Sequence, residues 1–138
     1  TRLCDTVALA SLLMCIMRML YRLRTRNQRW RLYTPMLIRE NRWRAMRYSF
    51  DEGLIDLAKG QVVPFEDLLD ELCSLVSEDA RALGCEQEVS SVRDILTRGT
   101  SAHRQLKDYE LERASGSSVE DSLKAVVDTL IEDTAQGL

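Results

Sequence analysis

Residues that break helices are scarce in this chain, and their positions limit what it can form. The 138 residues include only 2 prolines and 6 glycines, and none of these precedes Pro35. With 45% hydrophobic and 30% charged residues, the composition is that of a folded helical protein and not of a disordered one. The sequence therefore predicts a mainly α fold. We expect six or seven helices in one orthogonal or bundle-like domain that spans residues 1–138.

Apolar residues recur at intervals of three and four along most of the chain, which predicts amphipathic helices. Asp5 or Thr6 would cap the first helix, Pro35 and Pro64 would open two others, and Gly84 and Gly99 would each end one. The expected helices run from about residue 6 to 24, from Pro35 past Met46, from Pro64 through Val76, from Ser77 to Gly84, over residues 86–98, from Thr100 or Ser101 towards residue 115, and from Ser118 past Leu130. Short apolar pairs separated by glycines predict at most a small hairpin near residues 54–63.

Residues 7–17 are almost wholly apolar, but arginines at 18, 22 and 24 leave the run shorter than the roughly 20 residues that a bilayer requires. We expect a helix buried on nearly every side and no membrane segment. The four cysteines lack the short paired spacing of a metal site, which predicts reduced, mostly buried thiols and no metal. Together with the lack of a secretory signal, this predicts a cytoplasmic protein.

Charge is distributed unevenly along the chain. Residues 1–48 contain 11 arginines against two acidic residues, a net +9, so the remaining residues carry −12 of the total −3. Either the two halves pack against each other, or the basic half binds an acidic partner or a nucleic acid. The low aromatic content, 6%, argues against stacking on nucleic-acid bases. An interaction module with an arginine-rich first half is therefore the alternative to an enzyme.

Four segments resemble, in the right order, the C-terminal part of the carboxylate-amine ligases, the type 2 glutamate-cysteine ligase family. The longest is residues 40–48, ENRWRAMRY. The others are residues 2–5 (RLCD), residues 96–102 (LTRGTSA) followed by RQL at 104–106, and residues 123–128 (LKAVVD) with Glu132 and Thr134. One departure is Ser49, where the family usually has glycine.

The resemblance implies a fold related to glutamine synthetase and a reaction in which ATP and magnesium activate a glutamate carboxylate as an acyl phosphate. It implies Arg2, Asn41 and Arg47 as contacts to substrate or ATP phosphate, while Arg104 would either do the same or lock two helices together. The family's acidic magnesium ligands lie on sheet strands that precede the region matched here. We therefore expect this chain alone to be catalytically incomplete, to bind neither ATP nor magnesium, and to need an N-terminal catalytic half or a homo-oligomer. Its small-molecule substrate would be an amino acid, and its catalytic residues stay unassigned.

Overall fold

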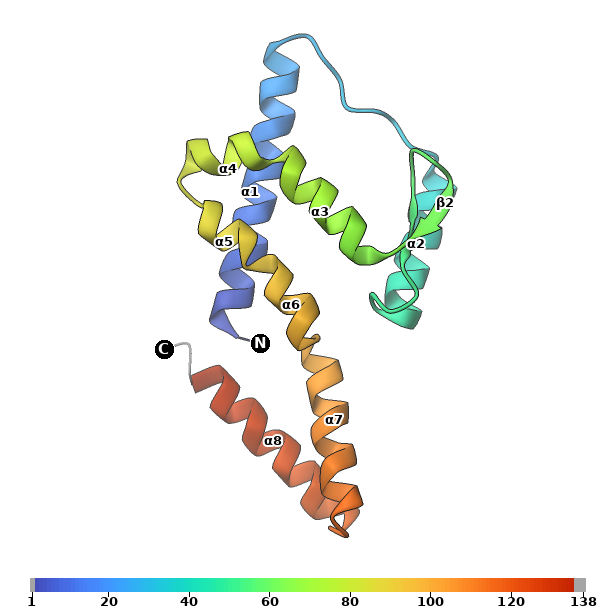
Figure 1. The fold of residues 1–138 in the computed structure, drawn as a ribbon, viewed down its shortest axis with the longest axis vertical. Helices are drawn as coiled ribbons and strands as arrows, with labels where there is room; N and C mark the ends of the chain where they lie inside the picture. Colours follow the sequence, from blue (N-terminus) through green and yellow to red (C-terminus); the bar gives the residue numbers. More distant parts are fainter. Residues whose placement is uncertain (1, 136–138) are drawn as a thin grey trace. The chain divides into compact units, whose positions relative to one another are not determined.

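The computed structural model describes residues 2–135 and is mainly α, as predicted (Figure 1). In chain order the elements are α1 (Leu3–Thr25), α2 (Pro35–Tyr48), β1 (Leu54–Asp56), β2 (Gln61–Val63), α3 (Phe65–Leu75), α4 (Ser77–Leu83), α5 (Glu86–Ser90), α6 (Val92–Arg98), α7 (Ser101–Ala114) and α8 (Val119–Ala135). Single residues, Val76 and Ser91, separate α3 from α4 and α5 from α6. Counted as interrupted helices, these pairs reduce the number within the described residues to the six or seven expected.

The chain divides into two compact units, one formed by residues 1–10 and 90–138 and the other by residues 11–89. Helix α1 contributes its first turns to the former, called unit 1 here, and its remainder to the latter, called unit 2. The single-domain organisation stays a prediction.

Helix α1 buries one stripe of side chains and leaves its other faces exposed. The stripe consists of Ala8, Leu12, Cys15 and Met19, at the spacing of one helix face. Leu13 and Met17 on other faces are 62% and 71% exposed. The expectation that residues 7–17 are buried on nearly every side is therefore wrong for the described residues, because only one side of the helix has other elements to pack against.

The start of α1 also differs from the prediction. The helix begins at Leu3, so Asp5 lies within its first turn instead of capping it, and an acidic side chain there favours the helix dipole. Helix α1 is long and apolar enough to cross a membrane. A core helix of a water-soluble protein can satisfy the same two criteria of length and composition. The absence of a membrane segment stays a prediction.

In unit 2 the other buried apolar side chains come from α3, α4, the residue between them and α5: Leu69, Cys73, Val76, Ala80 and Val89. Helix α2 packs beside the two-stranded hairpin (Figure 1). The predicted hairpin near residues 54–63 is confirmed: β1 and β2 are antiparallel, with Ile55 opposite Val62. Gly53 has φ +67°, and a Cβ at this position would collide with the carbonyl oxygen of Val63. Only glycine fits the turn into β1.

In unit 1, α7 and α8 form a helical hairpin around a turn at residues 115–118 (Figure 1). Ser118 accepts a hydrogen bond from the Asp121 backbone N–H at 3.1 Å, as the predicted cap requires, and its hydroxyl donates to the Asp121 carboxylate at 2.6 Å. The buried face of α8 includes Ser122, Val126 and Asp133. An acidic residue thus lies on the face that packs inward.

Candidate functional site

Two of the predicted site residues, Arg2 and Arg104, meet at the Asp133 carboxylate in unit 1. The Nε and Nη2 atoms of Arg2 donate to Asp133 Oδ1 at 3.0 and 2.6 Å. Arg104 Nη2 lies 3.2 Å from Asp133 Oδ2, and its Nη1 donates to the Gly99 carbonyl at 3.0 Å. Arg104 therefore joins α7 to α8 and to the end of α6, which is the helix-locking role that its sequence position left open.

The cluster is partly withdrawn from water, because Asp133 is 8% exposed. Hydrogen bonds from Arg2, with a smaller contribution from the Arg104 charge, outweigh the effect of burial and hold the pKa of Asp133 below its ordinary value of 3.8. The same contact raises the pKa of Arg2. Both arginines thus have a carboxylate partner within the chain, which reduces the positive charge that they could offer a ligand.

A neighbouring ion pair strengthens unit 1. Arg98 at the end of α6 contacts Asp5 in the first turn of α1, with 2.7 Å between Nη2 and Oδ1. Asp5 belongs to the RLCD segment and Arg98 to LTRGTSA. Two segments that carry the family resemblance are therefore in direct contact.

Asn41, a further predicted site residue, uses its amide within unit 2. Its Nδ2 donates to the Ile55 carbonyl at 2.8 Å, and its Oδ1 accepts from the Ile55 N–H at 2.7 Å. Arg44 supports the same connection by donating to the backbone carbonyls of Glu52 and Gly53. Asn41 thus fastens α2 to β1 through both ends of its amide, with one N–H and one oxygen lone pair beyond these two bonds.

Arg47 is placed differently, because it is exposed and makes no ion pair within the described part of the chain. One and two turns earlier on the same face of α2 lie Trp43 and Arg39. Arg42, also exposed, has no acidic partner among the described residues either. The exposed arginines of α2, at 39, 42 and 47, form what we call the α2 basic face. Guanidinium groups of this kind can bind a carboxylate or a phosphate.

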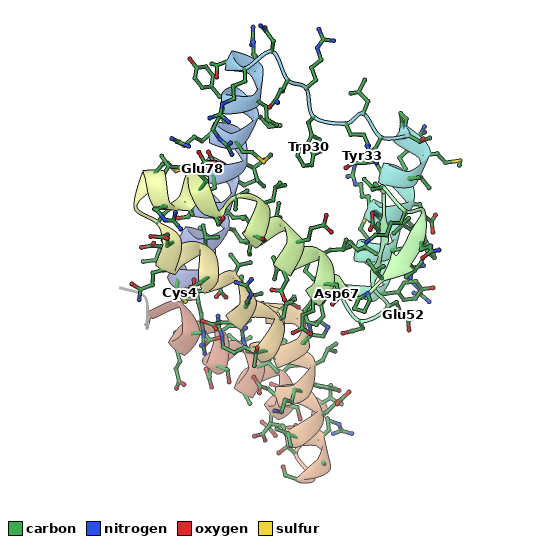
Figure 2. All side chains as sticks on the ribbon, turned by 45° about the horizontal axis from the view of Figure 1, so that its top comes forward. Cys4, Trp30, Tyr33, Glu52, Asp67 and Glu78 are labelled. Atoms are coloured by element: carbon green, nitrogen blue, oxygen red, sulfur yellow. The ribbon has the colours of Figure 1, made fainter. Side chains whose placement is uncertain are left out.

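Sequence reasoning did not identify the most deeply buried charged group, Asp79 of α4, which is 0% exposed. Arg18 Nη1 lies 2.5 Å from its Oδ1, and Arg22 Nη2 lies 2.9 Å from its Oδ2. Arg22 also pairs with Glu78, labelled on α4 in Figure 2, at 3.1 Å. The Arg22 hydrogen bonds, followed by those from Arg18, hold the pKa of Asp79 below 3.8 against the opposing effect of burial.

The spacing of Arg18 and Arg22 could have indicated this contact. Arg18 and Arg22 are four residues apart, so they lie on the same face of a helix that is apolar around them. Two arginines on a packing face indicate a carboxylate on the helix that packs against it. Packing of the basic half against the acidic half is thus observed for Arg18 and Arg22 of α1. Binding of an acidic partner or a nucleic acid by the α2 basic face stays a prediction.

A polar hollow of about 650 Å³ lies where α1 ends, lined among others by Arg24, Arg29 and Trp30. Trp30 lies with Tyr33 on the connection between α1 and α2 (Figure 2). Neither arginine has an acidic partner among the described residues. The hollow is a second place in unit 2 where an anionic group could bind.

The described residues contain no group of three or more His, Cys, Asp or Glu side chains arranged to hold a metal ion. His103 is used structurally: its Nδ1 accepts from the Thr100 backbone N–H at 3.1 Å, and the Thr100 hydroxyl in turn accepts from the His103 N–H, which closes the N-terminus of α7. Residues 2–135 therefore offer no such cluster to the magnesium that the resemblance implies.

The sequence is similar to one known protein family and to several curated proteins. Residues 1–128 match the profile of the Glutamate-cysteine ligase family 2. A protein from Rhodospirillum rubrum is 53% identical over all of this chain, which covers 36% of that protein, and one from Jannaschia sp. (strain CCS1) is 50% identical over 96% of the chain and 35% of its own length. A third, from Sorangium cellulosum, is 46% identical over all of the chain and 35% of its own length.

All three relatives are named "Putative glutamate--cysteine ligase 2". The chain thus spans about one third of the length of the curated relatives that it matches. No solved structure matches it.

Proposed function

Because the chain belongs to the glutamate-cysteine ligase family 2, we propose that it supplies the C-terminal helical portion of an ATP-dependent carboxylate-amine ligase. In this proposal the complete enzyme joins the carboxylate of glutamate to an amine, with cysteine the first candidate, through an acyl phosphate. The single observation that carries the proposal is the family match over residues 1–128 of a chain that spans only about a third of its relatives. The isolated chain would be inactive.

Within this proposal the four candidate residues divide into two groups. Arg47 is the best placed to contact a substrate carboxylate or an ATP phosphate, since it is exposed and has no ion-pair partner in the described chain. A cation beside the transferring phosphoryl group would stabilise its negative charge. Arg2, Arg104 and Asn41 would act as positioning residues, since their polar groups hold Asp133, Gly99 and Ile55.

The cofactor belongs to the complete enzyme. Membership of this ligase family implies the use of ATP, which supplies the phosphoryl group that activates the carboxylate. The contribution of this chain would be the α2 basic face. The magnesium ligands would come from the part of the family's length that this chain does not span.

Exposed apolar residues on α1 support a packing partner. Leu13, Met14, Met17 and Tyr21 are each more than half exposed, at 62%, 56%, 71% and 70%. A soluble protein rarely leaves so large an apolar surface uncovered. We propose that the N-terminal catalytic part of the ligase covers it, with a second copy of the chain as the alternative, in a cytoplasmic enzyme.

The direct test is a chimera with a relative first shown to join glutamate to cysteine with ATP, such as the Rhodospirillum rubrum protein. This chain replaces the matching third of that relative, and product formation is measured for the chimera, the unaltered relative and the isolated chain. We expect activity in the first two only. Activity of the isolated chain would contradict its incompleteness, and a folded but inactive chimera would contradict the ligase role.

A matched pair of variants in the chimera tests the assignment of Arg47. Arg47→Gln should lower kcat/KM by about tenfold to a hundredfold, since loss of one charge-assisted contact costs about 1.5 to 3 kcal/mol. Arg31→Gln is the control, because Arg31 is also exposed but lies on the α1–α2 connection. Equal activities of the two variants would remove Arg47 from the site.

The interaction-module alternative rests on the same exposed arginines. If they bound nucleic acid, the isolated chain would be retained on a polyanion column at low salt and released steeply as salt is raised. We expect no retention even at low salt, which would exclude this alternative, whereas retention that falls steeply with salt would support it.

A further inference from the structure

Two cysteines far apart in sequence lie with their sulfur atoms adjacent in unit 2. Cys15, on the buried stripe of α1, and Cys85, directly after the glycine that ends α4, have their Sγ atoms 3.5 Å apart. Both are free thiols. Their separation of 70 residues explains why sequence spacing did not indicate a pair.

The environments of the two thiols differ in a way that orders their reactivity. Cys15 is 0% exposed, whereas Cys85 is partly exposed. Burial, followed by the hydrogen bond with Cys85, raises the pKa of Cys15 to about 11. Since the thiolate is the reactive form, Cys85 is the sulfur that meets an oxidant first.

The turn that carries Cys85 has room for the adjustment that a covalent bond requires. A disulfide places the sulfurs about 2.05 Å apart, so the two atoms must approach by about 1.5 Å. Gly84 has φ +69° and no neighbouring atom within 4 Å of the position that a Cβ would occupy. A rotation of the two side chains, with a shift of this turn, would bring the sulfurs together.

We propose that Cys15 and Cys85 form a reversible redox site, closed to a disulfide by a small-molecule disulfide such as oxidised glutathione. The Cys85 thiolate attacks one sulfur of the oxidant, breaks its S–S bond and releases one thiol, leaving a mixed disulfide on Cys85. The Cys15 sulfur then attacks Cys85 Sγ, the bond between Cys85 Sγ and the small-molecule sulfur breaks, and the departing thiolate takes the proton from Cys15 and leaves as the second thiol. In sum, two protein thiols are oxidised by two electrons and one small disulfide is reduced to two thiols.

The bond would fasten α1 to the junction of α4 and α5. Helices α1 and α4 are already in contact through the ion pairs of Arg18 and Arg22 with Asp79. Oxidation would therefore make the packing of α4 on α1 covalent and leave the α2 basic face unaltered. This inference does not depend on the proposed ligase function.

The experiment equilibrates the complete protein in glutathione buffers of increasing oxidised fraction, quenches with acid, alkylates and maps peptides without reduction. We expect a Cys15–Cys85 linked peptide whose amount rises with the oxidised fraction and is reversed by excess thiol. Exposed Cys4 should form only a mixed disulfide with glutathione. Reduced Cys15 and Cys85 in every buffer, with Cys4 modified, would overturn the proposal.

A variant pair provides the second measurement. Oxidation should raise the urea midpoint of the wild-type protein and of Cys4→Ser, because a cross-link restricts the unfolded chain. Cys85→Ser should show no such rise, and its partial exposure allows the serine to reach water. An equal rise in Cys85→Ser would assign the effect to another thiol and also overturn the proposal.

Discussion

Replacement of Asp79 by asparagine should be the most destabilising single-atom change in unit 2. The Asp79 side chain is 0% exposed and accepts three hydrogen bonds, one from Arg18 and two from Arg22. Removal of one partner from a buried ion pair costs about 3 to 5 kcal/mol when the other charges stay buried. Here the Arg18 and Arg22 side chains are 37% and 21% exposed, so water can solvate them in part. We therefore expect a loss of about 2 to 3 kcal/mol for Asp79→Asn.

The adjacent residue is the natural control. Glu78 also pairs with Arg22, at 3.1 Å, but its side chain is 62% exposed, so Glu78→Gln should lower stability by less than about 1 kcal/mol. Urea unfolding followed by circular dichroism measures both variants, with the m value required to match that of the wild type. The reasoning assumes that burial of the carboxylate, more than its pairing with arginine, determines how much it contributes to the free energy of unfolding. A difference of less than about 0.5 kcal/mol between the two variants would refute it.

Three further predictions concern other contacts. Acidification should destabilise the protein, because Asp79 and Asp133 have pKa values below 3.8 in the folded state. Their contribution to the stability of the fold is present above pH 3.8 and is lost as the pH falls through the lowered pKa values. Urea midpoints measured across a pH series will show this loss. Asn41→Ala should cost about 1 to 3 kcal/mol and speed hydrogen exchange at the Ile55 amide, which loses its acceptor; unchanged exchange would contradict the contact. Ser49→Gly should raise the melting temperature through a gain of about 0.5 to 1 kcal/mol, because Ser49 has φ +56°; a lower melting temperature would show that its side chain matters more than its backbone.

Local signals in the sequence predicted most of the helices and the hairpin. Pro35 opens α2, Gly84 ends α4 in a left-handed conformation, and Thr100 caps α7, each as its residue type requires. Ser49, where the family usually has glycine, takes a positive φ of 56°. These features depend on residues within one turn of each other, so the sequence alone contains the information.

Burial and the pairing of distant groups could not be predicted in the same way. The apolar run of α1 does not say how many elements will pack around it, and only one of its stripes is buried. Arg2 and Arg104 were identified, but their common partner Asp133 was not, although its place on the face of Ser122 and Val126 was a usable signal. Cys15 and Cys85 meet only because α4 packs on α1.

The division of the chain into units has a consequence for its synthesis on the ribosome. Unit 2 is continuous from residue 11 to residue 89, so all its parts are available once that stretch has emerged. Unit 1 joins the first ten residues to those after 89, and its Arg2–Asp133 contact spans 131 positions. Since domains fold as their segments are translated, Arg2 meets its partner only after the 131 positions up to Asp133 have been translated. The first turns of α1 would be the last part of the helix to find their final packing.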